Sequence, residues 1–128
     1  MPSTNVNSGT VTVTRGTATR LGTIAAVSQV VQFNVPEPVR DAQGFMIIAT
    51  TGTAGTTPTL EGSIDQGNSW FVLGTSSTIV LNLTGQLNGD AAASSADAYQ
   101  VNGMGSGTLF RYGFAGGTPN CVVWACFG

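Results

Sequence analysis

The residues that come closest to a catalytic pair in this sequence are two carboxylates in one short stretch, Glu61 and Asp65. Paired carboxylates hydrolyse glycosidic bonds when they lie about 5 to 9.5 Å apart. On one extended strand, four residues at ~3.3 Å each would separate Glu61 from Asp65 by about 13 Å. We therefore predict that both acids lie on a solvated sheet face. A small hydrolase is the least favoured of the functions considered.

Other catalytic chemistry lacks the residues that it needs. The chain has no histidine, and its four basic residues are all arginines. Ser-His-Asp and Cys-His nucleophiles, lysine Schiff bases and the usual zinc sites are therefore excluded. Residues 65–68 faintly resemble a calcium loop without its remaining ligands, and the glycines of residues 103–107 lack the strand–helix context of a phosphate loop. We predict that the chain is not an enzyme and has no catalytic, cofactor or metal site.

Aromatic side chains offer a different function, because sugars stack on exposed rings. Six aromatics could contribute to a sugar-binding face: Trp70, Phe71, Tyr99, Phe110, Tyr112 and Trp124. The favoured alternative is that aromatics on strands fill a hydrophobic core. Tyr99, in a long polar segment, is the best exposed candidate.

The elements that would position these residues are short strands separated by Gly, Thr and Pro turns. We predict strands at residues 10–14, 27–35, 45–49, 78–84, 108–115 and 120–127, and a hairpin at residues 57–73, with residues 15–23 as a turn. In the hairpin, Leu60, Gly62 and Ile64 are expected on the dry face. Turn signals about every ten residues are typical of a β-sandwich. The predicted fold is all-β, a single β-sandwich or jelly-roll-like domain over residues 10–128.

Two segments fall outside this pattern. Residues 1–9 are small, polar and aperiodic, and we expect a flexible arm that becomes ordered against a partner. Residues 85–107 are rich in Ala, Ser and Gly, and we expect a long insertion loop, the kind of loop that is often functional. Asp97 and Tyr99 are the predicted exposed contact residues of this loop.

The last predicted strand is apolar on both faces. One face carries Cys121 and Val123, and the other carries Val122, Trp124 and Cys126. A sandwich strand needs only one dry face, so the second must be covered by the same chain or by another copy. Val122, Trp124 and Cys126 are therefore a predicted subunit interface, with internal coverage as the open alternative. The two cysteines lie about 16 Å apart on such a strand, too far for a disulfide.

Composition limits the class of partner. Charged residues make up 8% of the chain against a usual quarter, and the formal net charge is −2. This excludes the basic surface that nucleic acid binding requires. The first ten residues have no signal-peptide pattern, and no apolar run reaches the roughly 18 residues that span a bilayer. We expect a protein made in the cytoplasm, without a membrane or nucleic acid partner.

Two groups of motifs resemble a recurring module of tailed-bacteriophage virion accessory proteins. The first runs from Gly55-Thr56-Thr57-Pro58-Thr59-Leu60 through a Gly-containing turn to Trp70. The second is Phe110-Arg111-Tyr112, followed by Gly116-Gly117-Thr118-Pro119 and a final apolar strand. The sequence departs from the module in its insertion at residues 85–107 and in its fully apolar ending.

The resemblance is closest to capsid decoration (cement) proteins and to small tail or fibre modules. It implies an all-β protein on the capsid surface of the virion, made in the host cytoplasm. Its partner would be the major capsid protein, and it would form a homo-oligomer, for which a trimer is the expected state. It would bridge capsid subunits and stabilise the head. The alternative is a carbohydrate- or receptor-binding module of a phage tail or fibre.

Overall fold

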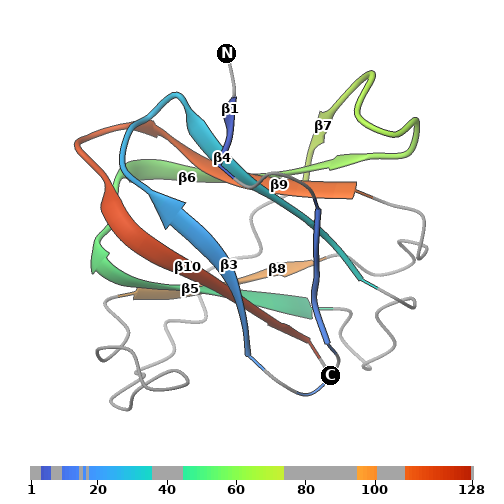
Figure 1. The fold of residues 1–128 in the computed structure, drawn as a ribbon, viewed down its shortest axis with the longest axis horizontal. Helices are drawn as coiled ribbons and strands as arrows, with labels where there is room; N and C mark the ends of the chain where they lie inside the picture. Colours follow the sequence, from blue (N-terminus) through green and yellow to red (C-terminus); the bar gives the residue numbers. More distant parts are fainter. Residues whose placement is uncertain are drawn as a thin grey trace.

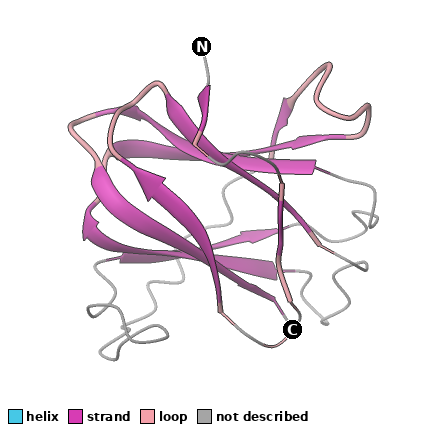
Figure 2. Cartoon of the chain, viewed as in Figure 1, coloured by secondary structure: helices cyan, strands magenta, loops and turns pink. Residues whose placement is uncertain are grey.

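The computed structural model describes residues 4–6, 10–14, 16, 18–35, 45–73, 95–100 and 109–127. These residues form ten strands and no helix (Figure 2). The strands are β1 (Thr4–Asn5), β2 (Val11–Thr12), β3 (Thr19–Ile24), β4 (Gln29–Asn34), β5 (Phe45–Thr53), β6 (Thr56–Ser63), β7 (Phe71–Val72), β8 (Ser95–Gln100), β9 (Leu109–Gly116) and β10 (Asn120–Phe127). The predicted all-β class is confirmed.

The strands form two sheets that pack face to face (Figure 1). The first sheet has the order β1-β4-β9-β6-β7, and β2 also pairs with β4. The second sheet has the order β3-β10-β5-β8. All the pairings are antiparallel except those of β1 and β2, which run parallel to β4. The fold is therefore a β-sandwich, as the sequence predicted.

The core between the sheets follows from period-two alternation. Along β9, Phe110, Tyr112 and Phe114 point inward and are at most 2% exposed, as predicted. Both sheets supply the other large buried side chains: Leu21, Ile24, Val31, Phe33, Met46, Ile48, Leu60 and Val123. Phe33 stacks on Phe110 with ring centroids 5.3 Å apart. This continuous core is the main source of stability, because burial of apolar area drives folding.

Residues 15–23, predicted as a turn, instead contain strand β3. Its register against β10 shifts between Val123, which is opposite Gly22, and Trp124, which is opposite Arg20, so Leu21 is the extra residue in the register. This β-bulge brings both Leu21 and Ile24 into the core although they are three residues apart. The prediction was wrong because the bulge removes the period-two signal.

The predicted insertion loop at residues 85–107 also contains a strand. Within it, β8 pairs antiparallel with β5 and forms one edge of the second sheet. Its residues are Ser-Ala-Asp-Ala-Tyr-Gln, a composition with weak strand preference. Pairing with β5 stabilises the extended conformation that the residues of β8 favour only weakly by themselves. The strand predicted at residues 78–84 lies outside the described residues.

The N-terminal segment differs from the expected free arm. Thr4 and Asn5 pair with β4 of the same chain, so this part of the arm is ordered without a partner molecule. Val13, farther along, is fully buried in the core. The first sheet therefore gains an edge made from the beginning of the chain.

Two of the connections between the sheets, β5–β6 and β9–β10, cross in close contact. Gly55, between β5 and β6, lies so close to β9 that an added Cβ would be 2.7 Å from the Cβ of Phe114. An added Cβ on Gly116 would be 2.6 Å from Oγ1 of Thr56. Gly52 has φ +106° and would meet the carbonyl oxygen of Asn120 at 2.7 Å. The Gly-Thr motifs are thus explained by chain packing, since only glycine fits such close approaches.

Candidate binding surface

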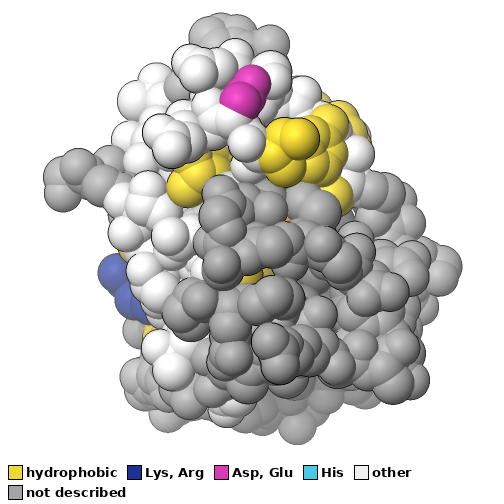
Figure 3. All heavy atoms as spheres, turned by 90° about the vertical axis from the view of Figure 1, so that its right-hand side faces the viewer, with side chains coloured by type: hydrophobic (Ala, Val, Ile, Leu, Met, Phe, Trp, Pro, Cys, Tyr) yellow, Lys and Arg dark blue, Asp and Glu magenta, His cyan; other side chains and the backbone are white. Residues whose placement is uncertain are grey.

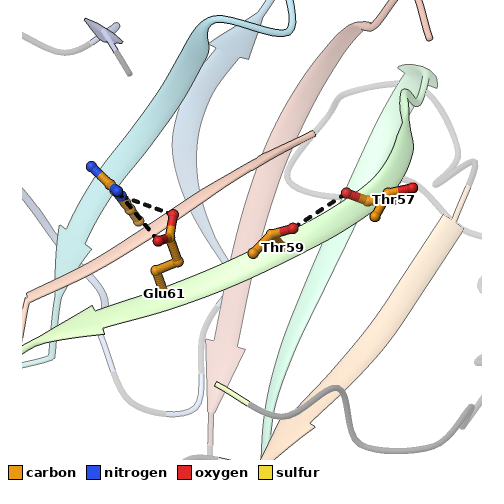
Figure 4. A network of polar contacts seen from close by, with 4 residues as sticks. Thr57, Thr59 and Glu61 are labelled. Carbon is orange, nitrogen blue, oxygen red and sulfur yellow. Dashed lines mark hydrogen bonds and ion pairs between the residues drawn. The ribbon is translucent and has the colours of Figure 1, made fainter. Parts of the chain in front are cut away.

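The outer face of the first sheet carries an ion pair between β6 and β9. Glu61 and Arg111 are directly opposite each other in the register. Nε of Arg111 donates to Oε1 of Glu61 at 3.0 Å, and Nη2 donates to Oε2 at 3.3 Å (Figure 4). Each side chain is 16% exposed. The pair is bidentate and mostly shielded from water, which makes it stronger than a typical surface ion pair.

Trp70 covers this ion pair. The guanidinium carbon of Arg111 lies 4.2 Å from the centre of the Trp70 ring, a cation–π contact. An added Cβ on Gly67 would lie 3.6 Å from the same ring. Trp70 is thus held between β9 and the β6–β7 turn, which does not leave it as an open platform for a sugar.

The β6–β7 turn is fixed by Asp65. Its carboxylate accepts hydrogen bonds from the Ser63 hydroxyl at 2.8 Å, the Ser69 amide at 2.9 Å and the Ser69 hydroxyl at 2.5 Å. The Ser63 hydroxyl oxygen in turn accepts from the amide of Gly67 at 2.8 Å. The hydrogen bonds, first those from Ser69, lower the pKa of Asp65 from 3.8 to about 2. The carboxylate is therefore a structural acceptor that stays ionised and organises the turn.

Glu61 and Asp65 make separate structural contacts. Strand β6 ends at Ser63, so Asp65 belongs to the turn and does not share the strand face that the sequence predicted. The carboxylate of Glu61 binds Arg111, and that of Asp65 binds the serines. Among the residues that the structure describes, no cluster of three or more His, Cys, Asp or Glu side chains could hold a metal ion.

The same hairpin exposes apolar side chains. Ile64 is 79% exposed, Val72 67% and Phe71 39%. We call these three residues the hairpin rim. Figure 3 shows hydrophobic side chains gathered near the top of the side of the molecule on which this hairpin lies, with an acidic side chain nearby. The register places Val72 opposite Glu61 and Phe71 opposite Gly62, so these two exposed side chains lie on opposite faces of the edge strand β7.

The hairpin rim was not predicted. Alternation along β6 placed Ile64 on the dry face with Leu60 and Gly62, and those two are indeed buried. The Asp65 turn interrupts the strand before Ile64, which leaves its side chain in solvent. The run from Trp70 to Leu73 was predicted as the second strand of the hairpin, but β7 pairs over only two residues at the edge of its sheet. The sequence signal for the hairpin rim was the hydrophobic run that directly follows a polar turn.

The predicted subunit interface is partly covered within one chain. Trp124 is 4% exposed and packs with Ala49, while Val122 and Ile47 lie against this second cluster half-buried. Cys126 is also half-buried. Internal coverage, the alternative left open by the sequence, thus accounts for Trp124. Nε1 of Trp124 is buried and has no hydrogen-bond partner among the described residues.

Both cysteines are free, as predicted. Cys121 belongs to the main core, and Cys126 lies on the opposite face of β10. Burial raises the pKa of each thiol above its ordinary value. Neither thiol has the lowered pKa of a reactive nucleophile.

The predicted contact residues Asp97 and Tyr99 lie on β8. The register places Asp97 opposite Ile48 and Tyr99 opposite Met46. They thus belong to an edge strand of the second sheet, in place of the loop that was predicted. Of the other predicted sugar-binding aromatics, Phe110, Tyr112 and Trp124 are buried, as the core interpretation predicted, and Phe71 belongs to the hairpin rim.

The described part of the chain has no helix that is long and apolar enough to cross a membrane. In comparisons with known proteins, no family model, no curated protein and no solved structure matches this chain.

Proposed function

We propose that this chain is a structural accessory protein of a tailed-phage virion that binds the outer surface of the capsid through the hairpin rim. The major capsid protein is the proposed partner, and bridging of neighbouring capsid subunits is the proposed mechanism of head stabilisation. The support is threefold: the β-sandwich fold, the resemblance of the residue 55–70 and 110–119 motifs to virion accessory modules, and the exposed apolar rim. The rim is the observation that carries the proposal.

The rim is suited to docking because its support is rigid. Asp65 fixes the turn, and Arg111, paired with Glu61, holds Trp70 against the sheet. A preorganised surface loses little conformational entropy on binding. Full burial of each large apolar side chain contributes about 1.5 to 3 kcal/mol. Repetition over a symmetric shell increases the total attachment through avidity.

The edge position of the rim also favours binding. Natural proteins protect edge strands by keeping them very short or by adding charges, prolines or bulges. Strand β7 is short, and its residues Phe71 and Val72 provide neither charge nor proline. A capsid surface that covers this edge would bury apolar side chains without desolvating an unpaired charge.

The test is reconstitution of purified protein on phage heads that lack it. Wild-type protein is expected to bind in many symmetric copies and to raise the temperature at which heads break. A variant with Ile64→Ser and Val72→Ser should fold normally and bind weakly, because it changes only exposed side chains. Val27→Ser is the matched control, since Val27 is an exposed valine in the β3–β4 turn.

Electron microscopy of the decorated heads would give the position and copy number. Retained binding by the rim variant would rule out the rim as the docking surface. If the protein did not bind heads but bound host cells or glycans in few copies per particle, the receptor-binding alternative would replace the proposal.

A further inference from the structure

The free edge of β4 is closed by the beginning of the same chain. The amide of Thr4 donates to the carbonyl of Ser28 at 2.8 Å, and the amide of Val6 donates to the carbonyl of Val30 at 2.9 Å. The amide of Gln32 donates to Oδ1 of Asn5 at 3.2 Å, so a side chain continues the ladder where the strand ends. Farther along, the amide of Val13 donates to the carbonyl of Asn34 at 2.8 Å.

This closure is made in two separate pieces. The step from Asn5 to Val11 is six residues, whereas the step between their partners, Val30 and Phe33, is three. The two pieces are therefore not in one continuous register with β4. The second piece is anchored by fully buried Val13, whereas the first contributes only half-buried Val6 to the core. The first piece is the weakly held one.

The contacts of the first piece are those of an added strand. Its pairing involves β4 alone, in parallel orientation, which is slightly less stable per residue than antiparallel pairing. Peptides that extend a sheet edge bind in this way, with main-chain bonds for affinity and alternate side chains for specificity. Any segment with the same sequence would make the same bonds, whichever molecule it came from.

We propose that the β4 edge is a strand-acceptor site and that residues 4–6 of a second copy of this chain occupy it by exchange. Exchange of identical segments between protomers replaces each contact with an identical one, which makes it a low-cost route to oligomers. Neither the Thr-Asn-Val segment nor β4 carries a charged side chain, so no like charges face each other where these two segments pair. Strand exchange supplies a physical basis for homo-oligomer formation. It does not depend on capsid binding.

The test uses purified protein alone, in two forms that each carry one added cysteine. Thr4→Cys is placed in one tagged chain and Gln29→Cys in an untagged chain, because Thr4 and Gln29 are register partners. Both carry Cys126→Ala, and Cys121 is only 2% exposed. The chains are mixed at high concentration, incubated and treated with a short bis-maleimide. Exchange predicts a covalent dimer of one tagged and one untagged chain.

Three controls make the result decisive. A chain that carries both Thr4→Cys and Gln29→Cys should cross-link at any concentration and shows that the chemistry works. Thr23→Cys in place of Thr4→Cys reports random collision, because Thr23 is an exposed threonine on β3. Adding Val6→Asp to the Thr4→Cys chain should abolish the mixed dimer, because it places a charge where Val6 packs. Val6→Ser is the milder variant if Val6→Asp does not fold.

Cross-linking of the double-cysteine chain only within monomers, with no mixed dimer above the Thr23→Cys level, would overturn the proposal. Failure to bind phage heads would leave this result unaffected, so the two proposals can fail separately.

Discussion

Glu61 and Arg111 are 50 residues apart in sequence and directly opposite each other on neighbouring strands, joined by two hydrogen bonds of 3.0 and 3.3 Å. The pair locks β6 to β9 in the centre of the first sheet and presents Arg111 to the Trp70 ring. It connects the sheet to the hairpin that carries the rim.

We expect the charges of this pair to be coupled by about 1 kcal/mol, because the pair is bidentate and mostly shielded. Glu61→Gln, Arg111→Gln and the double variant form a double-mutant cycle measured by urea unfolding. Arg111→Lys should also destabilise, since lysine loses both the fork geometry and the stacking on Trp70. Arg20 is an exposed arginine on β3 whose Nη2 donates to the Thr23 hydroxyl at 3.4 Å, and Arg20→Lys, used for comparison, should cost less than Arg111→Lys. The coupling would be contradicted if the losses of unfolding free energy in the two single variants added up to the loss in the double variant.

The Asp65 turn should respond to acid in a defined pH range. Its folded pKa of about 2 lies below the ordinary value of 3.8. The stabilisation it provides is therefore complete above pH 3.8 and is lost as the pH falls from 3.8 through about 2. NMR titration of the Asp65 carboxyl group would measure this pKa directly.

Ser69→Ala should raise the pKa of Asp65 towards 3.8, because Ser69 makes the largest contribution to the shift. Ser28→Ala changes a serine whose side chain is exposed in another turn and should leave the pKa unchanged. An Asp65 pKa that stays near 2 in the Ser69→Ala variant would show that another group holds the carboxylate.

The crossing of the β5–β6 and β9–β10 connections should be intolerant of any side chain at Gly55. A methyl group there would be 2.7 Å from Phe114 and 2.8 Å from the carbonyl of Gly116, so either the backbone or the Phe114 ring must move. We expect Gly55→Ala to cost about 1 to 3 kcal/mol of unfolding free energy, as overpacking does. Thermal or urea unfolding would measure the loss.

Gly16→Ala separates this steric effect from backbone strain. Gly16 has φ +78° with nothing within 4 Å of an added Cβ, so the variant should lose only about 1 kcal/mol, from the left-handed conformation. Equal or smaller destabilisation by Gly55→Ala would mean that the crossing is less rigid than its distances indicate.

Trp124 should behave as a core residue. We expect Trp124→Ala to cost about 3 to 5 kcal/mol, the usual range for a buried large aromatic. Trp124→Phe should cost much less, because it also removes a buried N–H that has no partner among the described residues. Urea unfolding of both variants would measure the costs. A folded Trp124→Asp protein with altered assembly would restore the interface prediction for this residue.

The local sequence pattern was sufficient to predict the strands that are regular. The inward face of β9 follows from alternation, because successive side chains along a strand point to opposite faces. The start of β10 follows from the Gly116–Pro119 turn that precedes it. Pattern failed at β3, where a bulge breaks the period, and at β8, where pairing with β5 overrides weak local preference.

The candidate surface could be predicted only in part. The sequence located the hairpin and its turn, but the exposure of Ile64 depends on hydrogen bonds from Ser63 and Ser69 to Asp65 that end the strand early. The exposure of Phe71 and Val72 depends on β7 being an edge strand, which is a property of the sheet order.

The sequence by itself determined that this is an all-β protein with few charges, without histidine or lysine, and with Gly-Thr turns where the chain must pass closely. The tertiary structure decided that Glu61 is an ion-pair partner, that Trp124 is buried within one chain, and that the hairpin and the β4 edge are the surfaces to test. The physical reason is the separation along the chain over which each kind of interaction acts. Strand and turn preferences act between neighbouring residues, whereas ion pairs, burial and edges depend on which strands lie side by side.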